Sequence, residues 1–249
     1  SLMDIAVRKT AVGHSIVLMG YCDGGTGQSD FLGTKFPLSP ASAFLFVMEI
    51  DLGQNKVTWQ EEASISQAGI GEIMGYTLAI DPSNKYVYYT GMHDDNVKFR
   101  TNAQLSLSSS LSAFRFFVAR FDLATQKTTN LYTYPFTADQ ELRDIKVDTS
   151  GNIWITGLHT DIGKFGTIPA PHTGVGENAF LVMLDKNGVP QKGYFATGDK
   201  NERGDAIAFS TNGEVLWIGS TNSTTGFSVN NQSVNVSNTN NIFITKIAP

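Results

Sequence analysis

The stretch "RDIKVDTSGNIWITG" (143–157) consists of two short apolar runs separated by a Ser-Gly-Asn turn, and it ends in a glycine. Short runs rich in Ile, Val and aromatic residues are typical of β-strands. Glycine and asparagine tolerate the positive φ angles of tight turns, so they suit the segment between the two runs. The stretch therefore predicts a β-hairpin whose second strand ends at Gly157.

The same pattern occurs three more times along the chain. The second run and its glycine return in "SIVLMGYCD" (15–23), "KYVYYTGMHD" (85–94) and "EVLWIGSTN" (214–222), each after another apolar segment. The four strand-ending glycines lie 71, 66 and 62 residues apart; they are Gly20, Gly91, Gly157 and Gly219. Self-similarity at a period of tens of residues indicates a repeat architecture.

Two further runs complete each repeat. A third apolar run follows about 20 residues later, a loop far longer than the usual ~4 to 6 residues, and its phenylalanines keep nearly the same period: Phe46, Phe117, Phe180 and Phe243. A fourth, more polar run occurs in the first three repeats, at 56–64, 127–136 and 190–197. Its polarity is typical of an outer strand with one solvated face.

Four antiparallel strands whose hydrophobicity falls from first to last are typical of a β-propeller blade. We therefore predict an all-β protein, a single β-propeller domain over residues 1–249. Its four blades span about 3–68, 69–136, 137–197 and 198–249. The last blade lacks its outer strand.

The repeat resembles the bacterial β-propeller repeat called SBBP. The best match is "GDAIAFSTNGEVLWIGSTNSTTGFSVNN" (204–231) followed by "NNIFITKIAP" (240–249), and the third repeat is next. The resemblance implies a propeller, usually with more than four blades, in a secreted or cell-surface protein used for binding. It implies no catalytic residues. Three arrangements stay open: a part of a larger propeller, closure by four blades, or a homodimer that shares one ring.

Composition excludes several classes of partner and site. The formal net charge of −5 provides no basic face of the kind that neutralises phosphates, so nucleic acid is not an expected partner. Cys22 is the only cysteine, which excludes an internal disulfide and a thiolate zinc cluster. No apolar run approaches the roughly 18 residues of a membrane span.

The long loops between the second and third strands predict a functional face. They leave the same side of each blade as the connections between blades, and long loops on a rigid scaffold often carry binding residues. These loops are 21–43, 92–114, 158–178 and 220–241. We expect their exposed aromatic residues to contact a protein or glycan, unless they pack their own loops against the scaffold: Phe31, Phe36, Phe99, Phe165 and Phe227.

The residue two positions after the strand-ending glycine is, in the four repeats, Cys22, His93, His159 and Thr221. Acidic residues lie nearby, and we consider three of them as weak metal ligands: Asp23, Asp94 and Asp161. Imidazole beside carboxylate can bind a metal or act as a general base. Alternatively, these side chains cap the strand or pack beneath its loop, which the presence of histidine in only two repeats favours.

A second acidic set lies in the loops just before the innermost strands, at the mouth of the predicted channel: Glu72, Glu141, Glu202 and Asp205. Several carboxylates in one place can bind Ca²⁺, or they can simply be solvated. Arg143 and Arg203 alternate with these acids. Pairing with the arginines would remove the negative charge that a cation requires.

These observations lead to three functional hypotheses. The preferred one is a non-enzymatic propeller that binds a protein or glycan through the long-loop face. The second is a hydrolase or lyase that uses His93 or His159 with Asp94, Glu72 or Glu141. An active site would require at least three of these groups within about 4 to 8 Å of one point in a pocket. The third hypothesis is a purely structural spacer.

Overall fold

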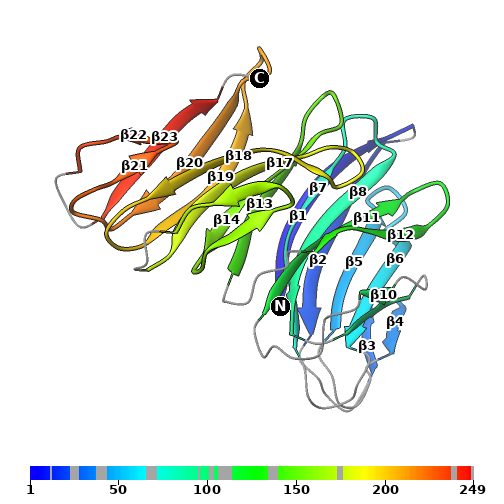
Figure 1. Cartoon of the computed structure of the whole chain (residues 1–249). Coiled ribbons are helices and arrows are strands. Elements are labelled where there is room, and N and C mark those ends of the chain that lie inside the picture. Colours follow the sequence, from blue (N-terminus) through cyan, green and yellow to red (C-terminus); the bar gives the residue numbers. More distant parts are fainter. Residues whose placement is uncertain are drawn as a thin grey trace. The chain divides into compact units, whose positions relative to one another are not determined.

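The computed structural model describes residues 1–11, 13–22, 28–37, 44–65, 72–94, 96–100, 104–105, 114–133, 140–172, 176–236 and 240–247. All regular secondary structure in these ranges is β-strand, so the predicted all-β class is confirmed (Figure 1). The chain divides into two compact units. The first comprises Ser1–Ser112 and Phe117–Leu131, and the second comprises Ala113–Phe116 and Tyr132–Pro249. Whether they form one domain stays a prediction.

Each unit contains the strands of two predicted repeats. In the first unit, one sheet has the order β1-β2-β5-β6 and continues into β9-β10, while the other has the order β12-β11-β8-β7. The strands of the first sheet are β1 (Leu2–Thr10), β2 (Gly13–Cys22), β5 (Phe44–Asp51), β6 (Lys56–Ile65), β9 (Val97–Phe99) and β10 (Gln104–Leu105). Those of the second are β7 (Ile73–Ile80), β8 (Tyr86–His93), β11 (Arg115–Asp122) and β12 (Lys127–Thr133). A separate hairpin pairs β3 (Gln28–Phe31) with β4 (Thr34–Pro37).

The second unit contains the third and fourth sheets. The third has the order β13-β14-β17-β18 and continues into β21-β22; the fourth has the order β19-β20-β23. The strands of the third are β13 (Gln140–Val147), β14 (Ile153–His159), β17 (Asn178–Leu184), β18 (Pro190–Thr197), β21 (Ser228–Val229) and β22 (Gln232–Ser233). Those of the fourth are β19 (Glu202–Phe209), β20 (Val215–Thr221) and β23 (Asn241–Ile247). A separate hairpin pairs β15 (Gly163–Phe165) with β16 (Ile168–Ala170).

The turns between the first and second strands of the repeats have the conformation predicted from their residues. The left-handed position in these hairpin turns is occupied by Asn84, Gly151 and Gly213, with φ of 57°, 84° and 81°. An aspartate stabilises the turn where one precedes it: Asp148 accepts hydrogen bonds from the backbone N–H groups of Ser150 and Asn152. Turn residues chosen for positive φ thus fix the register of the paired strands.

The sheets within a unit pack back to front. We call the face that carries the repeated phenylalanine (Phe46, Phe117, Phe180 or Phe243) the front of a sheet, and the opposite face its back. In the second unit, back-face residues Ala179 and Leu181 of the third sheet share a buried cluster with Trp217 and Phe243 of the fourth. In the first unit, the back of the first sheet packs in the same way against the front of the second.

A β-bulge in the first strand of every sheet supports this packing. The pairing of first and second strands shifts register between Leu2 and Asp4, and at the corresponding place in the other three sheets. The Asp4 carboxylate accepts a hydrogen bond from Leu78 N–H of the second sheet at 2.8 Å. Asp144 of the third sheet accepts one from Ile207 N–H of the fourth, also at 2.8 Å. These carboxylates join neighbouring sheets.

Candidate functional site

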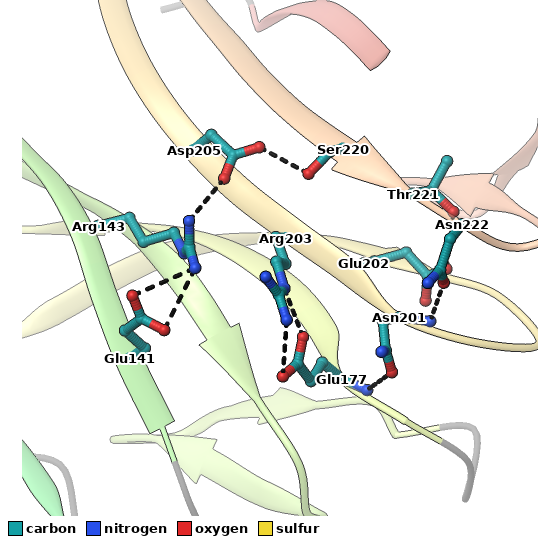
Figure 2. Close-up of polar contacts among 10 residues, drawn as sticks. All are labelled: Glu141, Arg143, Glu177, Asn201, Glu202, Arg203, Asp205, Ser220, Thr221 and Asn222. Atoms are coloured by element: carbon teal, nitrogen blue, oxygen red, sulfur yellow. Dashed lines mark hydrogen bonds and ion pairs between the residues drawn. The ribbon is translucent and has the colours of Figure 1, made fainter. Parts of the chain in front are cut away.

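Charged side chains along the inner strands of the second unit are paired with one another. Arg143 of β13 lies 3.2 Å from carboxylate oxygens of both Glu141 and Asp205 (Figure 2). The other oxygen of Asp205 accepts a hydrogen bond from Ser220 Oγ at 2.8 Å. Two of the acids considered as Ca²⁺ ligands are therefore ion-paired with Arg143, which neutralises part of their charge.

Arg203 of β19 forms a second paired arrangement. Its Nε donates to Glu177 Oε2 at 2.6 Å and its Nη2 to Glu177 Oε1 at 3.2 Å, a bidentate geometry visible in Figure 2. The hydrogen bonds that Arg203 donates to Glu177 raise the pKa of the guanidinium above its usual value. Both arginines of this region thus have carboxylate partners, although Glu177, the partner of Arg203, lies outside the acidic set predicted from the sequence. The region has little uncompensated charge for an ionic ligand.

Two asparagines connect the strand ends beside Arg203. Asn201 N–H donates to Asn222 Oδ1 at 2.9 Å, and Asn222 N–H donates to the Asn201 carbonyl at 3.1 Å. The Asn201 amide oxygen accepts a hydrogen bond from Glu177 N–H at 3.1 Å. The approach to β19 and the end of β20 are therefore held side by side.

Glu202 is a buried carboxyl group behind these asparagines. Thr221 Oγ1 and Ser223 Oγ donate hydrogen bonds to its Oε1. Its Oε2 has no hydrogen-bond partner among the described residues. Burial raises the pKa of Glu202 above its ordinary value, although the two hydroxyl donors oppose this shift. Its burial makes it unsuited to hold a cation at a channel mouth.

A pocket of about 380 Å³ lies at this end of the fourth sheet. It is formed by the start of β19, the end of β20 and the approach to β23. The residues that line it are Asn201, Arg203, Ser220, Thr221, Asn222, Asn240, Asn241 and Ile242. Amide and hydroxyl groups thus predominate, with one aliphatic side chain and one arginine that is already paired.

The predicted histidines are packed into their own sheets. His93 and His159 are both fully buried. The His93 ring lies 5.7 Å from that of Phe117, and the His159 ring lies 6.4 Å from that of Phe180. His159 Nδ1 is 2.9 Å from the Asp161 backbone oxygen, and burial lowers the pKa of this histidine. The repeated position therefore packs against the repeated phenylalanine instead of facing an open site.

The proposed metal ligands do not form a group. Asp94 Oδ1 accepts a hydrogen bond from Glu72 N–H at 2.6 Å. This contact joins two strand ends in the same way as the hydrogen bond from Asn201 N–H to Asn222 Oδ1. Asp23 lies outside the described residues. Within the ranges that the structure describes, no three His, Cys, Asp or Glu side chains could together hold a metal ion.

The loop aromatics are largely core residues. Phe99, Phe165 and Phe227 are at most 2% exposed, so the expectation that these rings are exposed is wrong. Two of them belong to loop segments that extend a neighbouring sheet: β9 pairs with β6, and β21 pairs with β18. The side chains of Phe31 and Phe36 lie outside the described part of the structure.

Sequence reasoning did not identify the asparagines of the pocket. Asn201, Asn222, Asn240 and Asn241 have the composition expected of turns. The available signal was their position, because all four lie at strand ends on the predicted long-loop side. Arg203 was identified, although only as a partner for the acids.

Comparisons with known proteins do not identify a family. No family model matches the sequence, and no curated protein matches it. Among solved structures, the chain is similar to a structural genomics protein of unknown function from Bacteroides thetaiotaomicron VPI-5482. The sequence identity is 12%, the TM-score is 0.30, and the match covers 88% of this chain and 68% of that chain. The described residues contain no helix that is long and apolar enough to cross a membrane.

Proposed function

We propose that the chain is a non-enzymatic β-propeller module of the SBBP type that binds a neutral, hydroxyl-rich ligand, namely a glycan, in the polar pocket of the fourth sheet. The sheet orders and the back-to-front packing within each unit support the propeller arrangement. A glycan ligand agrees with an extracellular or cell-surface location.

The bidentate pairing of Arg203 with Glu177 is the observation that carries this proposal. Arg203 is the one charged residue among the described residues that line the pocket, and its charge is already compensated. A phosphate or carboxylate ligand would have to displace Glu177 to gain a strong ionic contact. A saccharide needs no net charge, because its hydroxyl groups both donate and accept hydrogen bonds.

The remaining lining matches this chemistry. Asn240 and Ser220 provide an amide and a hydroxyl, and Ile242 provides an apolar surface for the carbon face of a sugar ring. Ligand sites commonly combine apolar surface with a few fixed polar groups. The Asn201–Asn222 contacts hold the backbone around the pocket in place, which lowers the entropy lost on binding.

The test is isothermal titration calorimetry of the whole chain with neutral hexasaccharides of glucose, mannose, xylose and N-acetylglucosamine. We expect one of them to bind, and we expect Asn240→Ala to weaken that binding about three- to tenfold, the effect of one or two lost hydrogen bonds. Asn187→Ala is the matched control, because Asn187 is exposed in the turn between β17 and β18. Failure of every neutral sugar to bind, or equal weakening by both variants, would overturn the proposal.

A further inference from the structure

A second pocket, of about 390 Å³, lies in the first unit. It is formed by the end of β1, the turn between β7 and β8, and the turn between β11 and β12. Every residue that lines it belongs to the first unit, so this unit alone builds the pocket. Its volume is sufficient for a small molecule, since small-molecule sites start at about 300 Å³.

Hydrogen bonds fix the two turns that form this pocket. Asp81 Oδ1 accepts hydrogen bonds from the backbone N–H groups of Lys85 and Tyr86, both at 2.7 Å. Leu123 N–H donates to the Lys85 carbonyl oxygen at 3.0 Å, which joins one turn to the other. A ligand in the pocket therefore meets a backbone that is already ordered, which lowers the entropy lost on binding.

Two of the three charged residues that line the pocket have no ion pair. Arg8 is compensated, because its Nη1 lies 2.7 Å from Glu49 Oε1. The Lys85 ammonium and the Asp122 carboxylate form no ion pair with any residue that the structure describes. One positive and one negative group are therefore available to a ligand.

The Asp122 carboxylate is held by its own turn through one oxygen only. Its Oδ1 accepts hydrogen bonds from the N–H groups of Ala124 and Thr125 at 2.8 and 3.0 Å. Its Oδ2 accepts no hydrogen bond from the described part of the chain. The carboxylate can therefore accept from a cationic ligand without losing its bonds to the turn.

Apolar surface lies beside these two charges. The Tyr86 ring lines the pocket, and the Arg120 Cζ atom lies 4.7 Å from its centroid. Leu123 also lines the pocket and packs against the buried cluster of the first unit. The pocket thus combines an ammonium group, a carboxylate and apolar side chains.

We infer that this pocket binds a small zwitterion, namely a free α-amino acid with an apolar side chain. Lys85 pairs with the ligand carboxylate, and the ligand ammonium donates to Asp122 Oδ2. The apolar side chain contacts Tyr86 and Leu123. A zwitterion pairs both charges at once, whereas a singly charged ligand would cover one of them without pairing it. The site shares no residue with the pocket of the fourth sheet and does not depend on glycan binding.

Isothermal titration calorimetry of the whole chain with L-phenylalanine and L-leucine tests this inference. We expect at least one of them to bind. The analogues that lack one charge should bind about tenfold more weakly, the effect of one lost charge-assisted contact. For L-phenylalanine these are phenylpropionate and phenethylamine, and for L-leucine they are methylpentanoate and isoamylamine. No binding of either amino acid at about 1 mM, or equal binding of an analogue, would overturn the inference.

The variants Lys85→Met and Asp122→Asn separate the two charges. Each should weaken amino-acid binding about tenfold. Asparagine keeps an amide oxygen for the two N–H groups of the turn, so Asp122→Asn removes the charge alone. Lys85→Met should leave the affinity for the amine analogue unchanged, and Asp122→Asn should leave that for the carboxylate analogue unchanged. Wild-type affinity for the amino acid in either folded variant would overturn the inference.

Two further variants serve as controls. Lys192→Met removes an exposed lysine of β18 that does not line the pocket, so amino-acid binding should not change. Asn240→Ala alters only the pocket of the fourth sheet, so it should leave amino-acid binding intact even if it abolishes glycan binding. Circular dichroism verifies that each variant is folded. Failure of this inference is thus distinguishable from failure of the proposed glycan site.

Discussion

The Phe46 ring lies across Gly20, so that a Cβ atom at position 20 would stand 2.6 Å from the ring Cζ. The two residues are paired across β2 and β5. The same contact recurs between Gly91 and the Phe117 ring. The glycine period therefore reflects two close approaches: a phenylalanine ring at Gly20, Gly91 and Gly219, and a backbone oxygen at or beside the first strand at all four glycines.

Gly20→Ala should lower the free energy of unfolding by about 1 to 3 kcal/mol, the usual effect of overpacking a buried site. The added methyl group would also meet the Ser1 backbone oxygen, which cannot rotate away. Gly53→Ala in the turn between β5 and β6 is the control, because the nearest atom there is 3.3 Å away. Urea denaturation compares the two variants. Similar losses would contradict the close packing of the Phe46 ring and the Ser1 backbone oxygen over Gly20.

Much of the strand pattern could be predicted from the sequence because it depends on local chemistry. Runs of apolar residues, Gly or Asn in the turns and the repeated Gly–Phe period all correspond to contacts within one sheet. The short strands of the long loops could not be predicted in this way. Val97–Phe99 and Ser228–Val229 contain three and two residues, too few to show a period, and they pair with a neighbouring repeat.

Phe227→Ala should destabilise the chain by about 3 to 5 kcal/mol, as expected for truncating a buried aromatic ring. Phe227 is 2% exposed and packs against Phe243 at 5.7 Å between ring centroids. Thermal unfolding followed by circular dichroism measures this loss. Val234→Ala provides a control in the same loop, because Val234 is 42% exposed. A fully stable Phe227→Ala variant would show that the ring is not a core residue.

The candidate site was predicted only in part, for a different reason. The alternation of Arg143 with acids correctly indicated its ion pair with Glu141, two residues away on the same strand. Arg203 instead pairs with Glu177, which is 26 residues away in the sequence. The aromatic and histidine candidates were chosen by residue type, and burial depends on contacts with distant strands. His159, for example, also lies 6.3 Å from the ring of Phe195 on β18, a strand that does not pair with its own. The residue type at a position therefore did not indicate how exposed its side chain is.

Asp144→Ala should lower the free energy of unfolding by about 1 to 3 kcal/mol, because Ile207 N–H would remain buried without its acceptor. Lys146→Ala is the control. It removes only the ion pair of a 40% exposed lysine with the same carboxylate, and exposed pairs contribute about 0 to 1 kcal/mol. Urea denaturation of both variants gives the comparison. If Lys146→Ala were the more damaging, the contact between sheets would not be the main role of Asp144.

Glu202→Gln should change the pH dependence of stability in a defined direction. Burial raises the pKa of Glu202 in the folded chain above the unfolded value of about 4.3. Between these two pKa values the folded state binds more protons than the unfolded state, so this residue makes stability fall as pH rises through that window. Glutamine remains neutral, and its amide oxygen can still accept from Thr221 and Ser223. The variant should therefore be as stable as the wild type near pH 4 and more stable than the wild type above the folded-state pKa.

Denaturation midpoints at closely spaced pH values measure the difference in stability, and Glu214→Gln supplies the contrast. The Lys246 contact lowers the pKa of Glu214, so its stabilising effect is lost as pH falls. A Glu202→Gln variant that loses stability at neutral pH would show that the buried carboxylate is stabilising, contrary to the effect of its burial.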